Sequence, residues 1–239
     1  MKHGSLFSGI GGFDLAAEWI GWENSFNIEI DSFCQRLLKF RFPNAKQFRD
    51  IREFDGKKYS GAIDIISGGF PCQNISLAAS KNRIGINGEK SGLWIEQHRI
   101  VSEIKPKFVV IENSATINKK GLGRLLGAYS DIGYDAEWYR FEPRQFGLPQ
   151  KRRQRTYIIL YTARIGNWLQ EKQILTRWDK PEYSTWRNSE DRIYGVVNGI
   201  PNRVDRHRAL GNAVVPRVAQ HIFSCIENSM QRISDSITE

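Results

Sequence analysis

Short apolar runs alternate with helical segments through the first two thirds of the chain, and this alternation constrains the fold most. A strand is predicted at residues 25–30, and the runs at 63–66 and 108–111 have the length and composition of buried parallel strands. Apolar residues at helical spacing precede Pro43 and recur over residues 93–104. Strands that alternate with helices predict a doubly wound α/β sheet, whose ligands bind at the carboxyl ends of its strands.

The pattern changes after residue 163. A late apolar strand is predicted at residues 156–161, but residues 164–206 mix tryptophans, tyrosines and arginines without a clear period. A helical pattern returns over residues 213–233. We therefore divide the chain into a main domain, residues 1–163, that is completed by the C-terminal helix 207–239, and an appendage at 164–206.

Charge and composition narrow the classes of partner and compartment. The 35 basic and 26 acidic residues give a net charge of +9 and an isoelectric point near 9.5, which favours a nucleic acid as partner. A basic protein without an anionic ligand is the alternative. The mean hydropathy of −0.47 and the polar N-terminal residues predict neither a transmembrane helix nor a signal peptide. Three scattered cysteines argue against a disulfide framework or a zinc site. We expect a reduced, metal-free, cytoplasmic protein.

A glycine-rich turn lies near the N-terminus, between a predicted strand and a predicted helix. Gly9, Gly11 and Gly12 leave backbone room for a nucleotide-like ligand. Glu29 follows Gly9 by 20 residues, at the end of the next strand. This spacing suits a carboxylate that accepts hydrogen bonds from ribose hydroxyls. A tight strand-to-helix turn without a ligand is the alternative.

Two more polar groups follow predicted strands. Cys72 lies on a loop constrained by glycine and proline, where an α/β protein can present a reactive thiolate. A small buried cysteine is the other interpretation. Glu112 emerges from an apolar strand, where burial would raise its pKa and let it act as an acid. An ordinary strand-end cap is the alternative there.

Positive charge is concentrated in residues 140–155. This stretch holds six basic residues and one acidic residue, a net charge of +5. Basic clusters are usually solvated surface, but arginines interleaved with glutamines also suit contacts to phosphates and bases.

These segments together resemble the DNA cytosine-5 methyltransferase family. Seven of them match the motifs of the family in order: residues 7–12, Glu29 with Asp31, Asp50 with Ile51, residues 69–76, residues 112–114, residues 147–150 and residues 210–216. The resemblance implies a Rossmann-like, S-adenosylmethionine-dependent methyltransferase sheet with helices on both faces. It also implies that 164–206 is a very small target-recognition subdomain and that the main domain is catalytic and cofactor-binding.

The activity implied is methyl transfer from S-adenosyl-L-methionine to carbon 5 of cytosine in duplex DNA, with S-adenosyl-L-homocysteine as product. The Cys72 thiolate would attack carbon 6 of a base flipped out of the duplex. Glu112 would contact ring nitrogen 3 and the exocyclic amine, and arginines would approach the ring oxygen and a phosphate. After Gln150 this chain carries one residue more than the family pattern. The functional arginine is therefore either Arg152 or the pair Arg153 and Arg155. We prefer the pair, because it keeps register with the strand that follows.

The resemblance also assigns binding residues. The cofactor-binding residues are Phe7, Gly9, Gly11, Glu29, Ile30, Asp50, Ile51, Leu93 and Asn212. The DNA-binding residues are Gln73, Ser76, Gln150 and Arg152.

The implied partner is duplex DNA, bound by a monomer of bacterial or phage origin. A restriction-modification system would add a cognate endonuclease, and the short recognition region of about 45 residues leaves room for a second subunit. Two other functions remain open. One is cytosine-5 methylation of tRNA, whose preformed loops would suit a small reader. The other is a catalytically silent partner subunit that binds DNA and the cofactor.

Overall fold

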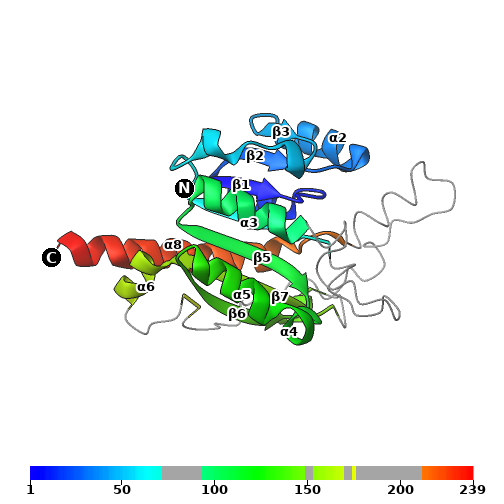
Figure 1. The fold of residues 1–239 in the computed structure, drawn as a ribbon. Coiled ribbons are helices and arrows are strands. Elements are labelled where there is room, and N and C mark those ends of the chain that lie inside the picture. The colour runs from blue at the N-terminus through cyan, green and yellow to red at the C-terminus, as the bar shows by residue number, and fades with distance from the viewer. Residues whose placement is uncertain (72–92, 149–152, 170–173, 176–211, 239) are drawn as a thin grey trace.

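The computed structural model describes residues 1–71, 93–148, 153–169, 174–175 and 212–238. Within them, seven strands form one sheet in the order β3-β2-β1-β4-β5-β7-β6 (Figure 1). The strands are β1 (Lys2–Leu6), β2 (Glu23–Ile28), β3 (Lys46–Phe48), β4 (Ile65–Gly68), β5 (Phe108–Ser114), β6 (Tyr134–Phe141) and β7 (Arg155–Thr162).

The first five strands are parallel, which confirms the α/β prediction for most of the sheet. β1 pairs with β2 and β4, β2 with β3, and β4 with β5, all in parallel register. Their carboxyl ends therefore lie at one edge of the sheet, where such folds bind ligands.

The last two strands depart from a purely parallel sheet. β7 runs antiparallel to both β5 and β6, and it lies between them. β6 carries no apolar run, because it is the edge strand and its central side chains are partly or fully exposed. Periodicity therefore gives no signal for β6, whereas the buried β7 matches the predicted strand at 156–161.

Helices cover both faces of the sheet (Figure 1). One face carries α3 (Leu93–Ile104) and α5 (Leu122–Asp131), and the other carries α1 (Gly12–Trp19) and α8 (Pro216–Thr238). β5 shows why two cores form. Val109 and Ile111 belong to the core under α3 and α5, while Phe108 and Val110 belong to the core under α1 and α8. Successive side chains of a strand point to opposite faces, so a continuous apolar run is buried on both faces of the sheet.

Six further helices lie in the described residues, and four of them are very short. They are the 3₁₀ helices η1 (Ile51–Glu53), η2 (Gly56–Tyr59) and η4 (Pro143–Phe146), and the α-helix α4 (Ile117–Lys120). α2 (Ser32–Arg41) follows β2, and α6 (Ala163–Leu169) follows β7. Ile165 and Leu169 of α6 join the core under α1 and α8.

Element boundaries differ from the predicted ones where side chains hold the backbone. The second strand was predicted at residues 25–30 but spans Glu23–Ile28, because the Glu29 carboxylate accepts the Asp31 N–H and turns the chain. Asp31 then caps α2 by accepting the N–H groups of Phe33 and Cys34. The last helix begins at Pro216 rather than at residue 213, since proline suits the first helical position.

Candidate cofactor and base-binding site

The turn between β1 and α1 has the backbone conformation that its glycines predict. Gly9 has φ +54° and Gly11 has φ +82°, and Phe7 between strand and turn has φ +53°. A Cβ added at Gly11 would lie 2.4 Å from Phe42, so packing as well as φ requires glycine there. A Cβ at Gly9 would meet nothing within 4 Å, which leaves open space in front of the turn. A bulky residue at positive φ is strained, and such strain is concentrated at ligand sites.

Glu29 closes this turn from the neighbouring strand. Its Oε2 accepts the Gly9 N–H at 2.7 Å, and its Oε1 accepts the Asp31 N–H at 2.8 Å. Each carboxylate oxygen keeps a further lone pair for a ligand hydroxyl. The side chain of Ile30 beside it is 57% exposed, although it is large and apolar. The structure thus brings Gly9 and Glu29 together, as their spacing predicts.

Asp50 and Ile51 lie at the end of the adjacent strand β3. Asp50 caps η1, and its carboxylate also binds the guanidinium of Arg52, with 2.5 Å between Oδ2 and Nη2. These hydrogen bonds lower the pKa of Asp50 to about 2. Arg99 of α3 holds the backbone of the segment that contains Ile51. Its guanidinium donates to the Ile51 carbonyl at 2.9 Å and to the Phe54 carbonyl at 3.1 Å.

Leu93 and Asn212 lie at the ends of described segments. Leu93 begins α3 and packs against the same core cluster as Phe7. Asn212 is exposed, and two residues later the Val214 carbonyl closes over α1, where a Cβ at Gly12 would approach it to 2.5 Å. The segment after Asn212 therefore joins the glycine turn, although it is about 200 residues away in sequence.

Glu112 is the buried acid of the site. It lies on β5 and is 9% exposed, and its Oε1 is 2.9 Å from Nε of Arg155 at the start of β7. Burial raises the pKa of Glu112 to about 7, against the opposing charges of Arg155 and Arg153. A carboxyl of this kind can carry a proton at neutral pH and donate it.

Arg153 is a second arginine close enough to Glu112 and Arg155 to interact with their charges. Its guanidinium donates to the carbonyl of Ala213, so it also ties the segment before α8 to the site. Burial and the neighbouring Arg155 lower the pKa of Arg153. The structure thus places Arg153 and Arg155 together beside Glu112.

The loop after β4 is held against Glu112. A Cβ at Gly69 would lie 3.0 Å from the Glu112 carboxylate, so glycine permits the close approach. Asn113 donates from Nδ2 to the Phe70 carbonyl at 3.2 Å. Sequence reasoning did not assign a role to Asn113 or Gly69; their place in the segments 112–114 and 69–76 was the available signal. The backbone that leads into Cys72 is therefore anchored to the strand of Glu112.

Several predicted residues lie outside the described part of the chain. They are Cys72, Gln73, Ser76, Gln150 and Arg152, together with residues 170–173 and 176–206 of the predicted recognition region. The domain boundaries and the DNA-binding assignments stay predictions.

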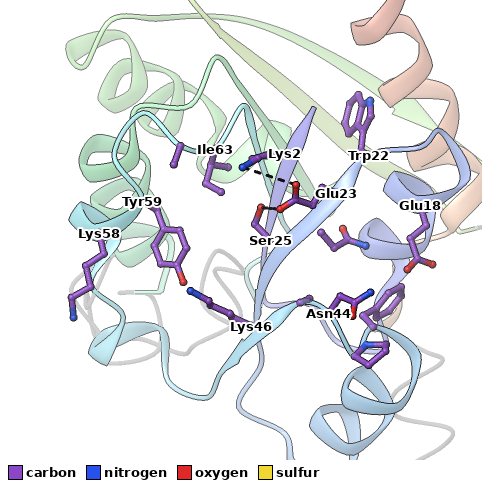
Figure 2. Close-up of a pocket in the computed structure, with 15 residues that line it drawn as sticks. Lys2, Glu18, Trp22, Glu23, Ser25, Asn44, Lys46, Lys58, Tyr59 and Ile63 are labelled. Atoms are coloured by element: carbon purple, nitrogen blue, oxygen red, sulfur yellow. Dashed lines mark hydrogen bonds and ion pairs between the residues drawn. The ribbon is translucent and has the colours of Figure 1, made fainter.

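A cavity of about 620 Å³ lies at the opposite end of the sheet (Figure 2). Lys2, Glu23, Lys46 and Ile63, at or near the amino ends of their strands, are among the residues that line it. It is therefore separate from the Glu29 and Glu112 end. Among the described residues, no His, Cys, Asp and Glu group has the arrangement of a metal site, and no helix there is long and apolar enough to cross a membrane.

Comparisons with known proteins agree on one family. The model of the family described as C-5 cytosine-specific DNA methylase matches residues 1–193. Type II methyltransferase M.CviJI of Paramecium bursaria Chlorella virus IL3A is 28% identical over 220 residues, which are 92% of this chain and 57% of that protein. Type II methyltransferase M1.ScrFI of Lactococcus lactis subsp. cremoris is 35% identical over 159 residues, 64% of this chain and 40% of that protein. The chain thus spans about half the length of the curated relatives it matches.

Solved structures share the fold. The S. pombe Dnmt2 methyltransferase aligns with a TM-score of 0.58 and 19% identity, over 68% of this chain and 51% of that one. The Entamoeba histolytica methyltransferase EhMeth aligns with a TM-score of 0.58 and 19% identity, over 67% of this chain and 52% of that one. These likenesses concern the fold, and they confirm the expected methyltransferase sheet with helices on both faces.

Proposed function

The chain belongs to the C-5 cytosine-specific DNA methylase family, and from this premise we propose that it methylates carbon 5 of cytosine in duplex DNA. The observation that carries the proposal is the buried Glu112, which is paired with Arg155 and packed against the loop that leads into Cys72. This arrangement offers a proton donor and a cation beside the loop residues that precede the predicted nucleophile in the sequence.

Family membership implies S-adenosyl-L-methionine as cofactor, and the residues of the glycine turn fit it. The open space at Gly9 gives a ligand access to the backbone, and the Glu29 carboxylate can accept ribose hydroxyls. The exposed Ile30 offers an apolar surface for a purine, beside the capped segment of Asp50 and Ile51. Phe7, Gly11, Leu93 and Asn212 complete the proposed pocket. The bound cofactor would supply an electrophilic methyl group.

The proposed reaction uses this chain's residues as follows. The Cys72 thiolate forms a bond to carbon 6 of the flipped cytosine, while Glu112 donates its proton to ring nitrogen 3. Carbon 5, now nucleophilic, would take the methyl group from the sulfur of the bound cofactor, which would leave S-adenosyl-L-homocysteine. Loss of the carbon-5 proton to solvent then expels the Cys72 thiolate, and the proton on nitrogen 3 returns to Glu112. The base regains its aromatic ring and Cys72 is regenerated.

The arginines would hold the base and its phosphate. Arg155 begins β7, opposite Ser114 of β5, and this register favours the pair Arg153 and Arg155 over Arg152 as the site arginines. Gln73, Ser76, Gln150 and Arg152 are proposed to contact DNA around the flipped base. Sequence readout is assigned to residues 164–206.

The relatives are named Type II methyltransferases and come from bacteria and a virus, which supports duplex DNA as substrate and a restriction-modification setting. We accordingly place the protein in the cytoplasm of a bacterium or phage-infected cell, bound to DNA as a monomer. A cognate endonuclease or a second subunit is the proposed partner.

The test compares wild type with Cys72→Ala, using Cys225→Ala of α8 as a matched control. We expect methyl transfer to plasmid DNA, read by bisulfite sequencing, in the wild type and in Cys225→Ala but not in Cys72→Ala. Duplex DNA containing 5-fluorocytosine should trap a covalent complex. Methylation of tRNA but not of DNA would favour the tRNA methyltransferase alternative. Binding of DNA and cofactor without any adduct or methylation would favour the catalytically silent subunit.

A further inference from the structure

The positive charge of the chain lies in two segments, and only one of them adjoins the site. Residues 36–58 hold eight basic and three acidic residues, a net charge of +5 that equals the +5 of residues 140–155. The rest of the chain holds 21 basic and 22 acidic residues, a net charge of −1. The site arginines belong to 140–155, so the basic side chains of residues 36–58 are a second concentration of charge without an assigned role.

All eight basic side chains of residues 36–58 are exposed. Local acids neutralise two of them, since Arg52 pairs with Asp50 and Lys58 lies 3.6 Å from Asp55. No hydrogen bond or ion pair in the described part of the chain engages the side chains of Arg36 and Lys39. Their charges are therefore available to an external anion.

One face of α2 combines cations with an exposed aromatic ring. Arg36, Lys39 and Phe40 stand at positions i, i+3 and i+4, so they are neighbours on the helix surface. Phe40 is 83% exposed, the highest value among the large apolar side chains that are exposed in the described residues. Cations beside an exposed aromatic ring are typical of surfaces that contact nucleic acid.

Two further exposed cations lie on and directly after β3, the edge strand that follows α2 in the chain. Lys46 begins β3 and Arg49 follows it, and both are exposed. Figure 2 shows Lys46 beside Tyr59, and its Nζ lies 6.0 Å from the centre of that ring. We call Arg36, Lys39, Phe40, Lys46 and Arg49 the α2–β3 basic surface.

Arg49 places one end of this surface at the same end of the sheet as the site, whereas Lys46 lies toward the other end, where it lines the cavity. Arg49 follows the carboxyl end of β3, as Glu112 lies toward the carboxyl end of β5, and the strands between them are parallel. Four strand spacings separate β3 from β5, which is about 19 Å across the sheet. A duplex rises 3.4 Å per base pair, so about six base pairs cover that distance.

We propose that the α2–β3 basic surface binds phosphates of the duplex DNA about six base pairs to one side of the target cytosine. The proposal rests on the proposed function, because the target base defines where the flanking DNA lies. It assigns to this surface part of the affinity that a short recognition region does not supply. Sequence readout would stay with the recognition region, since phosphate contacts carry no base information.

The experiment measures duplex binding by fluorescence anisotropy as a function of salt. The surface variant is Arg36→Gln/Lys39→Gln, and the matched control is Lys105→Gln/Arg124→Gln, which removes two exposed charges near the ends of α3 and α5. Glutamine keeps helix propensity close to that of lysine and arginine. Two duplexes share one central sequence and have about 8 and about 24 base pairs, so only the longer one spans the surface.

Loss of two phosphate contacts should reduce the slope of log affinity against log salt by about 2 on the long duplex. The affinity advantage of the wild type over the surface variant should shrink about tenfold between about 50 and 200 mM salt. On the short duplex the two proteins should bind alike, and the control should follow the wild type on both. Phe40→Ser should weaken long-duplex binding without changing the slope.

The proposal would be overturned if the control variant lost as much duplex affinity as the surface variant. It would also be overturned if the surface variant lost the same affinity on the short and the long duplex. It would also be overturned if the surface variant lost binding to vesicles of anionic phospholipid while its DNA binding was unchanged. Failure of the proposed function is distinguishable: a wild type that methylates no DNA but shows the length and salt dependence contradicts the methyltransferase assignment alone. A wild type that methylates DNA without that dependence contradicts only the surface.

Discussion

Arg155 holds Glu112 in a partly buried ion pair, with 2.9 Å between its Nε and Oε1 of the carboxylate. The pair exists because β7 lies antiparallel beside β5, with Arg155 opposite Ser114 and Tyr157 opposite Glu112. Removing Arg155 would leave the buried carboxylate of Glu112 without a compensating charge, so Glu112 depends on Arg155.

The first prediction concerns Arg155. Arg155→Ala should lower the single-turnover methylation rate about 100-fold, because the base site loses a preorganised cation. Arg155→Lys should recover part of the rate, since lysine keeps the charge without the planar guanidinium. Arg124→Ala, which removes an exposed arginine of α5, should react at the wild-type rate. A wild-type rate in Arg155→Ala would show that the pair has no part in the reaction.

The second prediction concerns pH. Burial raises the pKa of Glu112 from 4.5 to about 7, so between these values the folded protein keeps a proton that the unfolded chain has released. The stability from Glu112 is therefore complete below about pH 4.5 and is lost as the pH rises through about 7. Between those values the melting temperature of the wild type should fall with rising pH more steeply than that of Glu112→Gln.

The comparison with Glu112→Gln isolates this group, because burial also raises the pKa of Asp14 in α1 to about 7. Carbon-13 NMR of labelled glutamate carboxyls offers a direct measurement. The resonance that disappears in Glu112→Gln should titrate near pH 7, and a midpoint near 4.5 would contradict the proton-donor role. The single-turnover rate should correspondingly decline above pH 7.

The third prediction separates two glycines of the same turn. Gly9→Ala should cost about 1–2 kcal/mol of unfolding free energy from its positive φ, and its methyl group should project into the cofactor space. Gly11→Ala adds a clash 2.4 Å from Phe42 and should cost more stability. Calorimetric titration with S-adenosyl-L-homocysteine and thermal unfolding should therefore rank the two variants differently. Undiminished cofactor affinity in a folded Gly9→Ala would place the ligand elsewhere.

The fourth prediction concerns Arg99, which holds the adenine side of the proposed pocket. Its guanidinium bonds the Ile51 and Phe54 carbonyls and also pairs with Glu96 at 2.8 Å and Glu103 at 3.0 Å. Lysine cannot bond two carbonyls and two carboxylates at once, so the segment of Ile51 would be held less firmly. Arg99→Lys should therefore weaken S-adenosyl-L-homocysteine binding about tenfold. Duplex binding without cofactor should stay at the wild-type value, which serves as the internal control. Equal weakening of both ligands would indicate general destabilisation instead.

Sequence patterns predicted the parts of this fold that depend on local chemistry. The period of apolar residues located α2 and α3, and continuous apolar runs located the buried strands β4, β5 and β7. The edge strand β6 was missed, because its side chains are partly exposed and it has no apolar run. Its pairing energy comes from β7, which is a neighbour in space.

The candidate site likewise has features that the sequence predicts and features that depend on the tertiary structure. The glycine turn and its partner Glu29 were predictable, since consecutive strands of an alternating fold become neighbours and their spacing is nearly fixed. Arg153 and Arg155 were predicted from family resemblance, but their meeting with Glu112 depends on the insertion of β7 beside β5. The bond from Asn113 to the Phe70 carbonyl and the support that Arg99 gives to Ile51 had no sequence signal.

The sequence by itself determined the alternation of elements, the glycine turn with its positive φ angles, and the order of the motif-like segments. These features depend on backbone sterics and on periodicities of two and 3.6 residues, which act within a few residues of each other. The tertiary structure decided which charges share a buried space and which face the solvent. Desolvation and ion pairing depend on neighbours that are distant in the chain, so the raised pKa of Glu112 and the separate α2–β3 basic surface emerge only once the sheet is assembled.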